Sequence, residues 1–187
     1  MMVETTGAVL MERAAGGDRV AYAGIIERYR ESIRRVSYLM LHDGSAADDV
    51  AQETFTRGLE RVDAYRAKGE PLNWFYAIAL NLCRQNFRNS KRHAQRATTK
   101  VLDTGRRIRS PRRGILTSLI RRETRLALAV ALGYLTDRQR ETFILHYVEE
   151  LPYDEIGGIL GVSAGAARAL SHRAREVLRE HLGEDIL

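Results

Sequence analysis

The sequence is poor in cysteine and proline, and both shortages exclude structural classes. Cys83 is the only cysteine among 187 residues, so the chain can form no internal disulfide, and this residue alone cannot build a thiolate metal site. We expect Cys83 to be a small buried hydrophobic side chain. Three prolines and few runs of β-branched residues favour an all-α protein.

Long apolar segments are also missing. The longest apolar run, 126–135, is far shorter than the roughly 18 to 20 residues of a membrane span, so we expect no membrane insertion. The start of the chain holds Glu4 and Glu12 in place of a basic segment followed by an apolar one, so we expect no secretory signal. These absences predict a cytoplasmic protein.

Positive charge is what the chain has in excess. Lysine and arginine number 30 against 24 aspartates and glutamates, which gives a formal net charge of +6 at pH 7. Because 44% of the residues are hydrophobic, the chain can enclose the core of one ordinary domain or two small ones. Such a chain suits an anionic partner, nucleic acid or an acidic membrane, and charge alone does not choose between them.

In a first block, 20–92, apolar residues recur three and four positions apart, as amphipathic helices require. A breaker at 42–45 separates two helices, the second of which is expected over 46–62. Pro71 suits the first turn of a third helix, where its missing N–H is not needed, and this helix is expected to continue to about Lys91. The stripes expected to be buried are Tyr22, Ile26, Tyr29, Ile33, Val36 and Met40 in the first helix, and Ala47, Val50, Ala51, Thr54, Leu59 and Val62 in the second.

The helical pattern is lost at 93–114, where basic residues outnumber the single acid, Asp103. This segment predicts a flexible linker, either simply solvated or following DNA phosphates between two bound domains. Residues 1–19 are expected to be a tail that leads into the first helix.

A second block, 115–187, regains the helical pattern. Its first helix is expected to be weakened by Gly133. Thr136 and Gln139 have the spacing of a capping box, which marks the start of a further helix that continues through His146. The side chains expected to be buried before that start are Leu119, Leu126, Val130 and Leu135.

Residues 151–178 have the layout of a helix-turn-helix: a short amphipathic helix, a tight turn at Gly161 and an arginine-rich second helix. In this motif the first helix braces the second, which lies in the major groove of DNA. Gly161 permits a backbone turn that a β-carbon would hinder, and Ser163 can cap the second helix. The apolar joint between the helices is expected to contain Ile156, Ile159, Leu160 and Val162.

The second helix of this motif carries cations that can contact phosphates and guanine edges. Spacings of four and three place Arg168, His172 and Arg175 on one side of it, and the small residues at 164–167 would allow close approach to the groove. The alternative is an arginine-rich helix that is only solvated. The residues predicted to contact DNA are Arg168, His172, Arg173 and Arg175.

Three segments together resemble one protein family. They are DDVAQETF at 48–55, the helix that contains Trp74, and LTDRQRETFILHYVEELPYDEIGGILGVSAGAAR at 135–168. Their order and spacing are similar to those of bacterial sigma factors of the sigma-70 superfamily, of the extracytoplasmic-function (ECF) type, over about 20–92 and 119–182.

The resemblance implies two small helical domains, a sigma region 2 bundle at 20–92 and a region 4 domain with the helix-turn-helix at 115–187, joined by the flexible linker. It implies a transcription initiation factor that recognises minus-10 and minus-35 promoter elements and promotes DNA melting. Such a factor is no enzyme and uses no cofactor or metal. Its implied partners are core RNA polymerase, through the β′ clamp and the β flap, promoter DNA and an anti-sigma protein.

The resemblance also implies a surface that docks on the β′ clamp. This surface is a polar stripe at positions i, i+3, i+4 and i+7 of a helix, opposite the buried stripe. An acidic and amide stripe on a basic protein suits a basic protein partner better than DNA, and the alternative is a solvated helix face. The residues of the stripe are Asp49, Gln52, Glu53 and Thr56.

The third helix resembles the segment that melts the minus-10 element. An aromatic plane, an amide and two cations on one face can stack on an unpaired base and hold a single strand, although Trp74 can instead be plain core. The preceding loop, 65–70, resembles the one that captures a flipped base. The implied minus-10 residues are Tyr65, Arg66, Lys68, Trp74, Asn81, Arg84 and Arg88.

The chain departs from the family pattern at four positions. The family often has arginine where this chain has Ala77 and Leu80. In the second helix of the helix-turn-helix, Leu170 stands where arginine is common, and Ser171 stands where leucine is common. These departures leave some minus-10 contacts and the minus-35 reading open.

Two other classes of protein are alternatives. A one-component regulator would use the first block to dimerise or to sense a ligand, and would bind palindromic half-sites without polymerase. A nucleic-acid-processing enzyme needs metal ligands or an acid–base cluster. The five histidines are scattered, and Asp48 and Asp49 have no partner at metal-ligand spacing.

Overall fold

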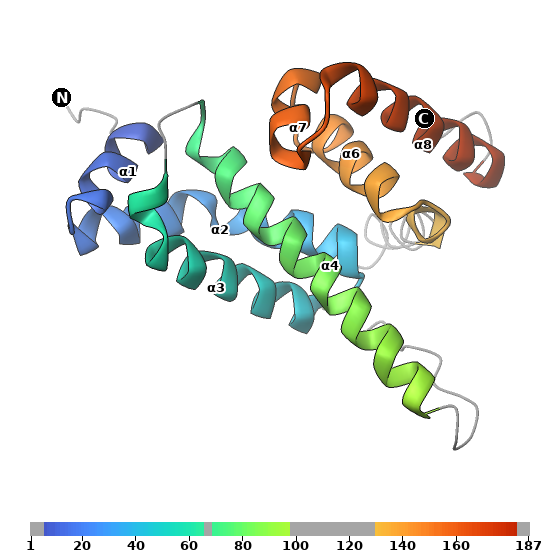
Figure 1. Cartoon of the computed structure of the whole chain (residues 1–187), viewed down its shortest axis with the longest axis horizontal. Helices are drawn as coiled ribbons and strands as arrows, with labels where there is room; N and C mark the ends of the chain where they lie inside the picture. The colour runs from blue at the N-terminus through green and yellow to red at the C-terminus, as the bar shows by residue number, and fades with distance from the viewer. Residues whose placement is uncertain (1–5, 66–68, 98–129, 183–187) are drawn as a thin grey trace, which may run out of the picture. The chain divides into compact units, whose positions relative to one another are not determined.

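The computed structural model describes residues 6–65, 69–97 and 130–182, and in these ranges it contains helices and no strands (Figure 1). The all-α fold expected from the sequence is confirmed. The chain forms two compact units, Met1–Leu41 with Ser45–Ser90, and His42–Gly44 with Lys91–Leu187.

The first unit begins with a helix that lies inside the expected tail. This helix, α1 (Gly7–Ala15), starts after Thr6, whose side chain accepts a hydrogen bond from an N–H of the first turn. It packs against α2 (Arg19–Leu41). Asp18 caps α2 by accepting from two N–H groups of its first turn, at 2.9 and 3.0 Å. A side chain thus caps the start of each helix, and Asp18 also accepts from the Arg13 side chain across the turn between them.

The first unit also contains α3 (Gly44–Glu60) from Ser45 on, the 3₁₀ turn η1 (Val62–Ala64) and α4 (Pro71–Ala97) as far as Ser90. Phe75 of α4 joins three helices, because its ring centre lies 5.2 Å from that of Phe55 on α3 and 6.2 Å from that of Tyr29 on α2. A β-carbon at Gly58 would lie 2.5 Å from the Phe75 ring and 2.7 Å from the Tyr22 hydroxyl, so glycine lets α3 approach closely.

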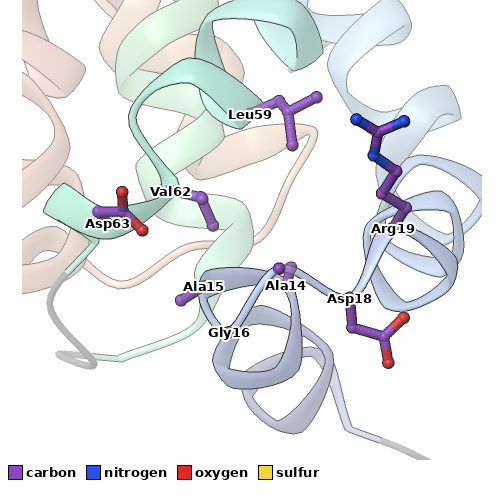
Figure 2. A pocket seen from close by; sticks show the side chains of 9 residues that line it. Ala14, Ala15, Gly16, Asp18, Arg19, Leu59, Val62 and Asp63 are labelled. Carbon is purple, nitrogen blue, oxygen red and sulfur yellow. The ribbon is translucent and has the colours of Figure 1, made fainter.

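The expected buried stripes hold with two exceptions. Ile25 is fully buried, whereas Ile26 is only half-buried, because Ile25 lies four residues before Tyr29 and Ile26 lies about 100° further round the helix. Leu59 is 49% exposed and lines a hollow of about 480 Å³ between the α1–α2 turn and η1 (Figure 2). Phe55 is buried on α3 in its place.

Two helix boundaries also differ from the expected ones. The breaker is shorter than expected, because α3 already begins at Gly44 and only His42 and Asp43 separate it from α2. Pro71 begins α4 as expected, but this helix continues to Ala97, since no glycine or proline interrupts the residues after Lys91. The first five residues of the expected linker are thus helical.

The second unit contains a helical segment at 130–133, followed by α6 (Asp137–Tyr147), α7 (Tyr153–Leu160) and α8 (Ala164–Leu182). The capping box is confirmed, because the Thr136 hydroxyl accepts from the Gln139 N–H at 3.4 Å and the Thr136 N–H donates to Gln139 Oε1 at 2.9 Å. Gly133 is the last helical residue before this cap.

The stripe expected ahead of the cap is only partly seen. Leu119 and Leu126 lie outside the described residues. Leu135 is buried, but Val130 is 60% exposed and does not belong to a buried stripe.

Arg140 is a buried cation that the sequence did not single out. Its Nε donates to the Leu132 carbonyl at 2.8 Å and its Nη2 to the Leu135 carbonyl at 3.3 Å. These carbonyls lie at and just beyond the end of the helical segment 130–133, where helices leave acceptors unsatisfied and favour positive charge. Burial lowers the pKa of the Arg140 guanidinium, which is held among these carbonyls.

Candidate polymerase and nucleic-acid surfaces

The predicted polymerase stripe lies on the outer face of α3. Asp49, Gln52 and Thr56 are exposed, and Glu53 is half-buried. The Glu53 carboxylate accepts from Nε of Arg57, one turn further along, at 2.7 Å. The stripe thus presents both acids, the amide and the hydroxyl at the surface, and the Glu53 side chain, 46% exposed, is paired with Arg57.

Trp74 is neither plain core nor a fully exposed stacking surface, the two alternatives that the sequence left open. It is half-buried, with its ring edge-on to Phe75 at 5.1 Å and to Tyr65 at 5.7 Å between ring centres. The contact with Phe75 ties the indole to the core, and the exposed part remains able to stack on a base. Burial raises the pKa of the Tyr65 hydroxyl, and that hydroxyl donates to the Gly69 carbonyl at 3.4 Å. The predicted residues Arg66 and Lys68 lie outside the described residues.

The other predicted minus-10 residues follow Trp74 along α4. Asn81 and Arg88 are exposed, and Arg84 is half-buried with its guanidinium hydrogen-bonded to the side-chain oxygen of Asn81. This bond orients the amide and the cation as one polar group. Leu80 is fully buried, so this departure from the family pattern belongs to the core, whereas Ala77 is half-buried.

The helix-turn-helix has the tight turn that its sequence predicts. Gly161 adopts the left-handed conformation with φ of 68°, which ends α7. A β-carbon at Gly157 would lie only 2.7 Å from the Val162 carbonyl oxygen, so a second glycine lets the turn fold back against α7. The Ser163 hydroxyl accepts from the Ala166 N–H at 3.1 Å, as expected of a cap for α8.

The joint that this turn creates is partly buried. Ile156 and Leu160 are buried as expected, whereas Ile159 and Val162 are half-buried.

The second helix of the motif, α8, has an outer face that carries the cations and an inward face that is buried. Arg168, His172 and Arg173 are exposed, and Arg175 is half-buried. The His172 Nδ1 lies 3.3 Å from the Glu176 carboxylate, a pair that carries opposite charges when the imidazole is protonated. The inward face, fully buried, consists of Ala167, Ser171, Ala174 and Leu178.

One small residue at the front of α8 was wrongly expected to face the groove. Ala167 is fully buried, whereas Ala164, Gly165 and Ala166 are exposed. Ala167 lies four residues before Ser171 on the inward face, so helical geometry turns it away from the cations.

Other features bear on what these surfaces can do. Cys83 is fully buried, as expected. Among the described residues, no group of three or more histidines, cysteines, aspartates and glutamates is placed to hold a metal ion. No helix in the described part of the chain is long and apolar enough to cross a membrane.

Comparisons with known proteins match both blocks of the sequence. The family model for sigma-70 region 2 matches residues 25–93, and that for sigma-70 region 4 matches residues 125–178. Together they cover more than half of the chain.

Individual relatives agree with these matches. The ECF RNA polymerase sigma factor SigW of Bacillus subtilis is 31% identical, over 89% of this chain and 91% of its own length. The ECF RNA polymerase sigma factor BldN of Streptomyces coelicolor is 29% identical over 94% of this chain and 66% of its own. The fold is similar to that of the sigma factor RpoE of Bartonella quintana, solved with the anti-sigma factor NepR, with a TM-score of 0.71 at 20% identity over 88% of this chain and 98% of that one. The chain therefore belongs to the sigma-70 family as an ECF sigma factor, which directs RNA polymerase to specific promoters at the start of transcription.

Proposed function

We propose that this sigma factor divides its work between three surfaces. The α3 stripe of Asp49, Gln52, Glu53 and Thr56 binds the β′ clamp of core RNA polymerase. The α4 face that begins at Trp74 engages the melted minus-10 element, and the cations of α8 read the minus-35 element as duplex. The observation that carries this division is the contrast between the exposed faces of α3, acidic and amide-bearing, and of α8, cationic.

Each DNA contact is expected to be weak alone. Binding to core RNA polymerase brings both DNA-binding regions to one promoter, so that the second contact forms at a high effective concentration. The linker expected at 93–114, whose residues from 98 on lie outside the described ones, would span the two contacts. The free factor should therefore bind promoter DNA poorly, and its complex with polymerase should bind well.

A mobility-shift assay with and without core RNA polymerase tests this proposal. The probe is a genomic fragment on which the complex initiates in run-off transcription. Equal, tight binding by the free protein would instead indicate an independent DNA-binding regulator.

Paired variants test the division of labour. Arg168→Ala with Arg173→Ala should weaken minus-35 dependence and leave core polymerase binding intact, because both side chains are exposed on α8. Asp49→Ala with Gln52→Ala on the exposed face of α3 should do the reverse, as measured by pull-down of polymerase subunits. Loss of polymerase binding in the α8 pair would contradict the assignment.

An anti-sigma protein is the further partner proposed for this chain. The structurally similar RpoE was solved in complex with the anti-sigma factor NepR. Because the α3 stripe is proposed to bind core RNA polymerase, an inhibitor that covers this stripe would compete with the polymerase. The same pull-down measures this competition. We further propose that the chain has no catalytic chemistry and no cofactor of its own and works in the cytoplasm, where RNA polymerase acts.

A further inference from the structure

Tyr153, the first residue of α7, contacts the two neighbouring helices α6 and α8. Its ring stacks on that of His146 in α6, with centres 4.3 Å apart and planes 27° from parallel. The guanidinium carbon of Arg168 in α8 lies over the Tyr153 ring, 5.4 Å from its centre. The Tyr153 hydroxyl donates to Oγ of Ser171, also in α8, at 3.3 Å. One side chain thus links the first helix of the motif to both faces of the second.

Ser171 gives the tyrosine a fixed partner. It is fully buried on the inward face of α8, where a hydroxyl left without a hydrogen bond is costly. The family pattern commonly has leucine at this position, and leucine offers no acceptor for a phenol. The irregular residue in the recognition helix is therefore the one that anchors the Tyr153 ring by its hydroxyl.

His146 restrains the ring from the opposite helix. Its Nδ1 lies 3.0 Å from the Leu151 carbonyl, so an N–H at that nitrogen donates to the segment that leads into α7. The stacked imidazole limits movement of the Tyr153 ring away from α8. The contacts with Ser171 and His146 therefore hold the Tyr153 ring, and the third contact of this ring is with the Arg168 guanidinium.

Arg168 is the group that benefits from this arrangement. It is exposed on the same side of α8 as His172, and a free arginine side chain would lose considerable rotamer freedom on binding DNA. A cation held against an aromatic face has fewer conformations to lose. Arg173, which is also exposed on α8, provides a natural comparison within the same helix.

We propose that Tyr153 and Ser171 are positioning residues for minus-35 reading, in which the Tyr153–Ser171 hydrogen bond sets the ring that holds Arg168 ready for a phosphate or a guanine edge. This inference rests on the proposed minus-35 role of α8. Tyr153 and Ser171 would then contribute to promoter affinity without touching DNA, because they act through Arg168.

A double-mutant cycle tests the coupling in the full chain bound to core RNA polymerase. The probes are a promoter fragment that supports initiation and the same fragment with its minus-35 segment randomised. Tyr153→Leu should weaken binding to the intact fragment about two- to fivefold, the factor expected for a cation–π contact, and should have no further effect when Arg168→Ala is present. The matched cycle of Tyr153→Leu with Arg173→Ala should be additive.

The hydroxyl bond is tested by smaller changes. Tyr153→Phe keeps the ring, and Ser171→Ala keeps the packing while removing the acceptor. Each should give a loss smaller than that of Tyr153→Leu, and the double variant should lose no more than either single one, because both break the same bond. Thermal unfolding of each variant separates a loss of folding from a loss of positioning.

The outcomes distinguish this inference from the function on which it rests. If Arg168→Ala has no effect on the intact fragment, the minus-35 role proposed for α8 is wrong. If Arg168→Ala weakens binding but Tyr153→Leu weakens it equally with and without Arg168, then Tyr153 acts only through folding, and the positioning role is overturned.

Discussion

The two units of this protein differ in the buried side chains that join their helices. In the first unit, Phe75 packs against rings from two other helices, and the buried hydroxyls of Ser37 and Thr54 donate to carbonyls four residues earlier in their own helices. In the second unit, Arg140 instead reaches the end of a neighbouring helix with two hydrogen bonds, and Tyr153 reaches Ser171 across the motif. Ring packing is prominent in the first unit, although the Tyr22 hydroxyl also donates from α2 to the Phe55 carbonyl of α3. The second unit adds a buried cation and a buried serine as hydrogen-bonding partners between its helices.

Helix length accounts for part of this difference. The helices α2, α3 and α4 have 23, 17 and 27 residues and α1 has 9, whereas α6, α7 and α8 have 11, 8 and 19. Short helices bury little apolar area, so a small unit gains proportionally more from a few well-placed hydrogen bonds. The comparison therefore predicts which substitutions each unit will tolerate.

The largest loss of folding stability is expected from Phe75→Ala in the first unit. Phe75 is fully buried, and removing its ring leaves a cavity among Tyr29, Phe55 and Trp74, at a cost of about 4 kcal/mol. Hydrogen exchange should show α2 and α3 losing protection while α6 and α8 keep theirs. Equal loss in both units would contradict the separation of the two cores.

A somewhat smaller loss is expected from Arg140→Met in the second unit. Methionine fills much of the volume but leaves the Leu132 and Leu135 carbonyls without the charged donor, which should cost about 3 kcal/mol. Urea unfolding, monitored by hydrogen exchange in α6, measures the loss of stability. Arg173→Met, at an exposed position, is the control. If the two variants are equally stable, the directional bonds of this unit matter little.

Gly7 and Gly24 form a matched pair that tests close packing in the first unit. A β-carbon at Gly7 would collide with the Tyr29 hydroxyl, which is hydrogen-bonded to Glu70, whereas one at Gly24 would lie in ordinary contact, 3.5 Å from Leu10. Gly7→Ala should therefore lower stability by about 1 kcal/mol, and Gly24→Ala should raise it by about 0.5 kcal/mol. Calorimetric melting temperatures should move in opposite directions, and a rise for both would show that the Gly7 contact yields easily.

The smallest effect concerns Asp18, an exposed directional contact in the first unit. Backbone N–H groups of α2, chiefly that of Ala21, and the Arg13 side chain hold the pKa of this carboxyl below its usual value. A lowered native pKa adds stability that is present at pH 7 and is lost as the pH falls below about 4. The stability difference between the natural chain and Asp18→Asn should shrink between pH 7 and pH 3, and a constant difference would exclude this carboxylate as its source.

Features set by neighbouring residues were predictable from the sequence. The Thr136–Gln139 capping box, the turn at Gly161 and the Ser163 cap each depend on residues within a few positions, so their spacing suffices. The stripe on α3 followed from helical periodicity, and its exposure is seen in three of its four members. Its assignment to polymerase stays a prediction.

Features set by distant residues were not predictable. Periodicity alone cannot choose Ile25 over Ile26, because both fall within the width of an apolar stripe. Arg140 reads as one more surface cation until the carbonyls of the preceding helix are seen around it. Ser171 reads as a departure from the family pattern in α8 until Tyr153 is found beside it.

The short helix α1 bears on how promoter specificity can be exchanged between related factors. Met11 and Ala14 are buried where α1 packs on α2 and η1, and Gly7 seats against Tyr29, yet the region 2 family match begins only at residue 25. A chimera joined at that residue would combine a foreign helix with a surface shaped for this one. Grafts of the region 2 bundle should therefore be joined ahead of Thr6, so that α1 is transferred together with the bundle that it completes.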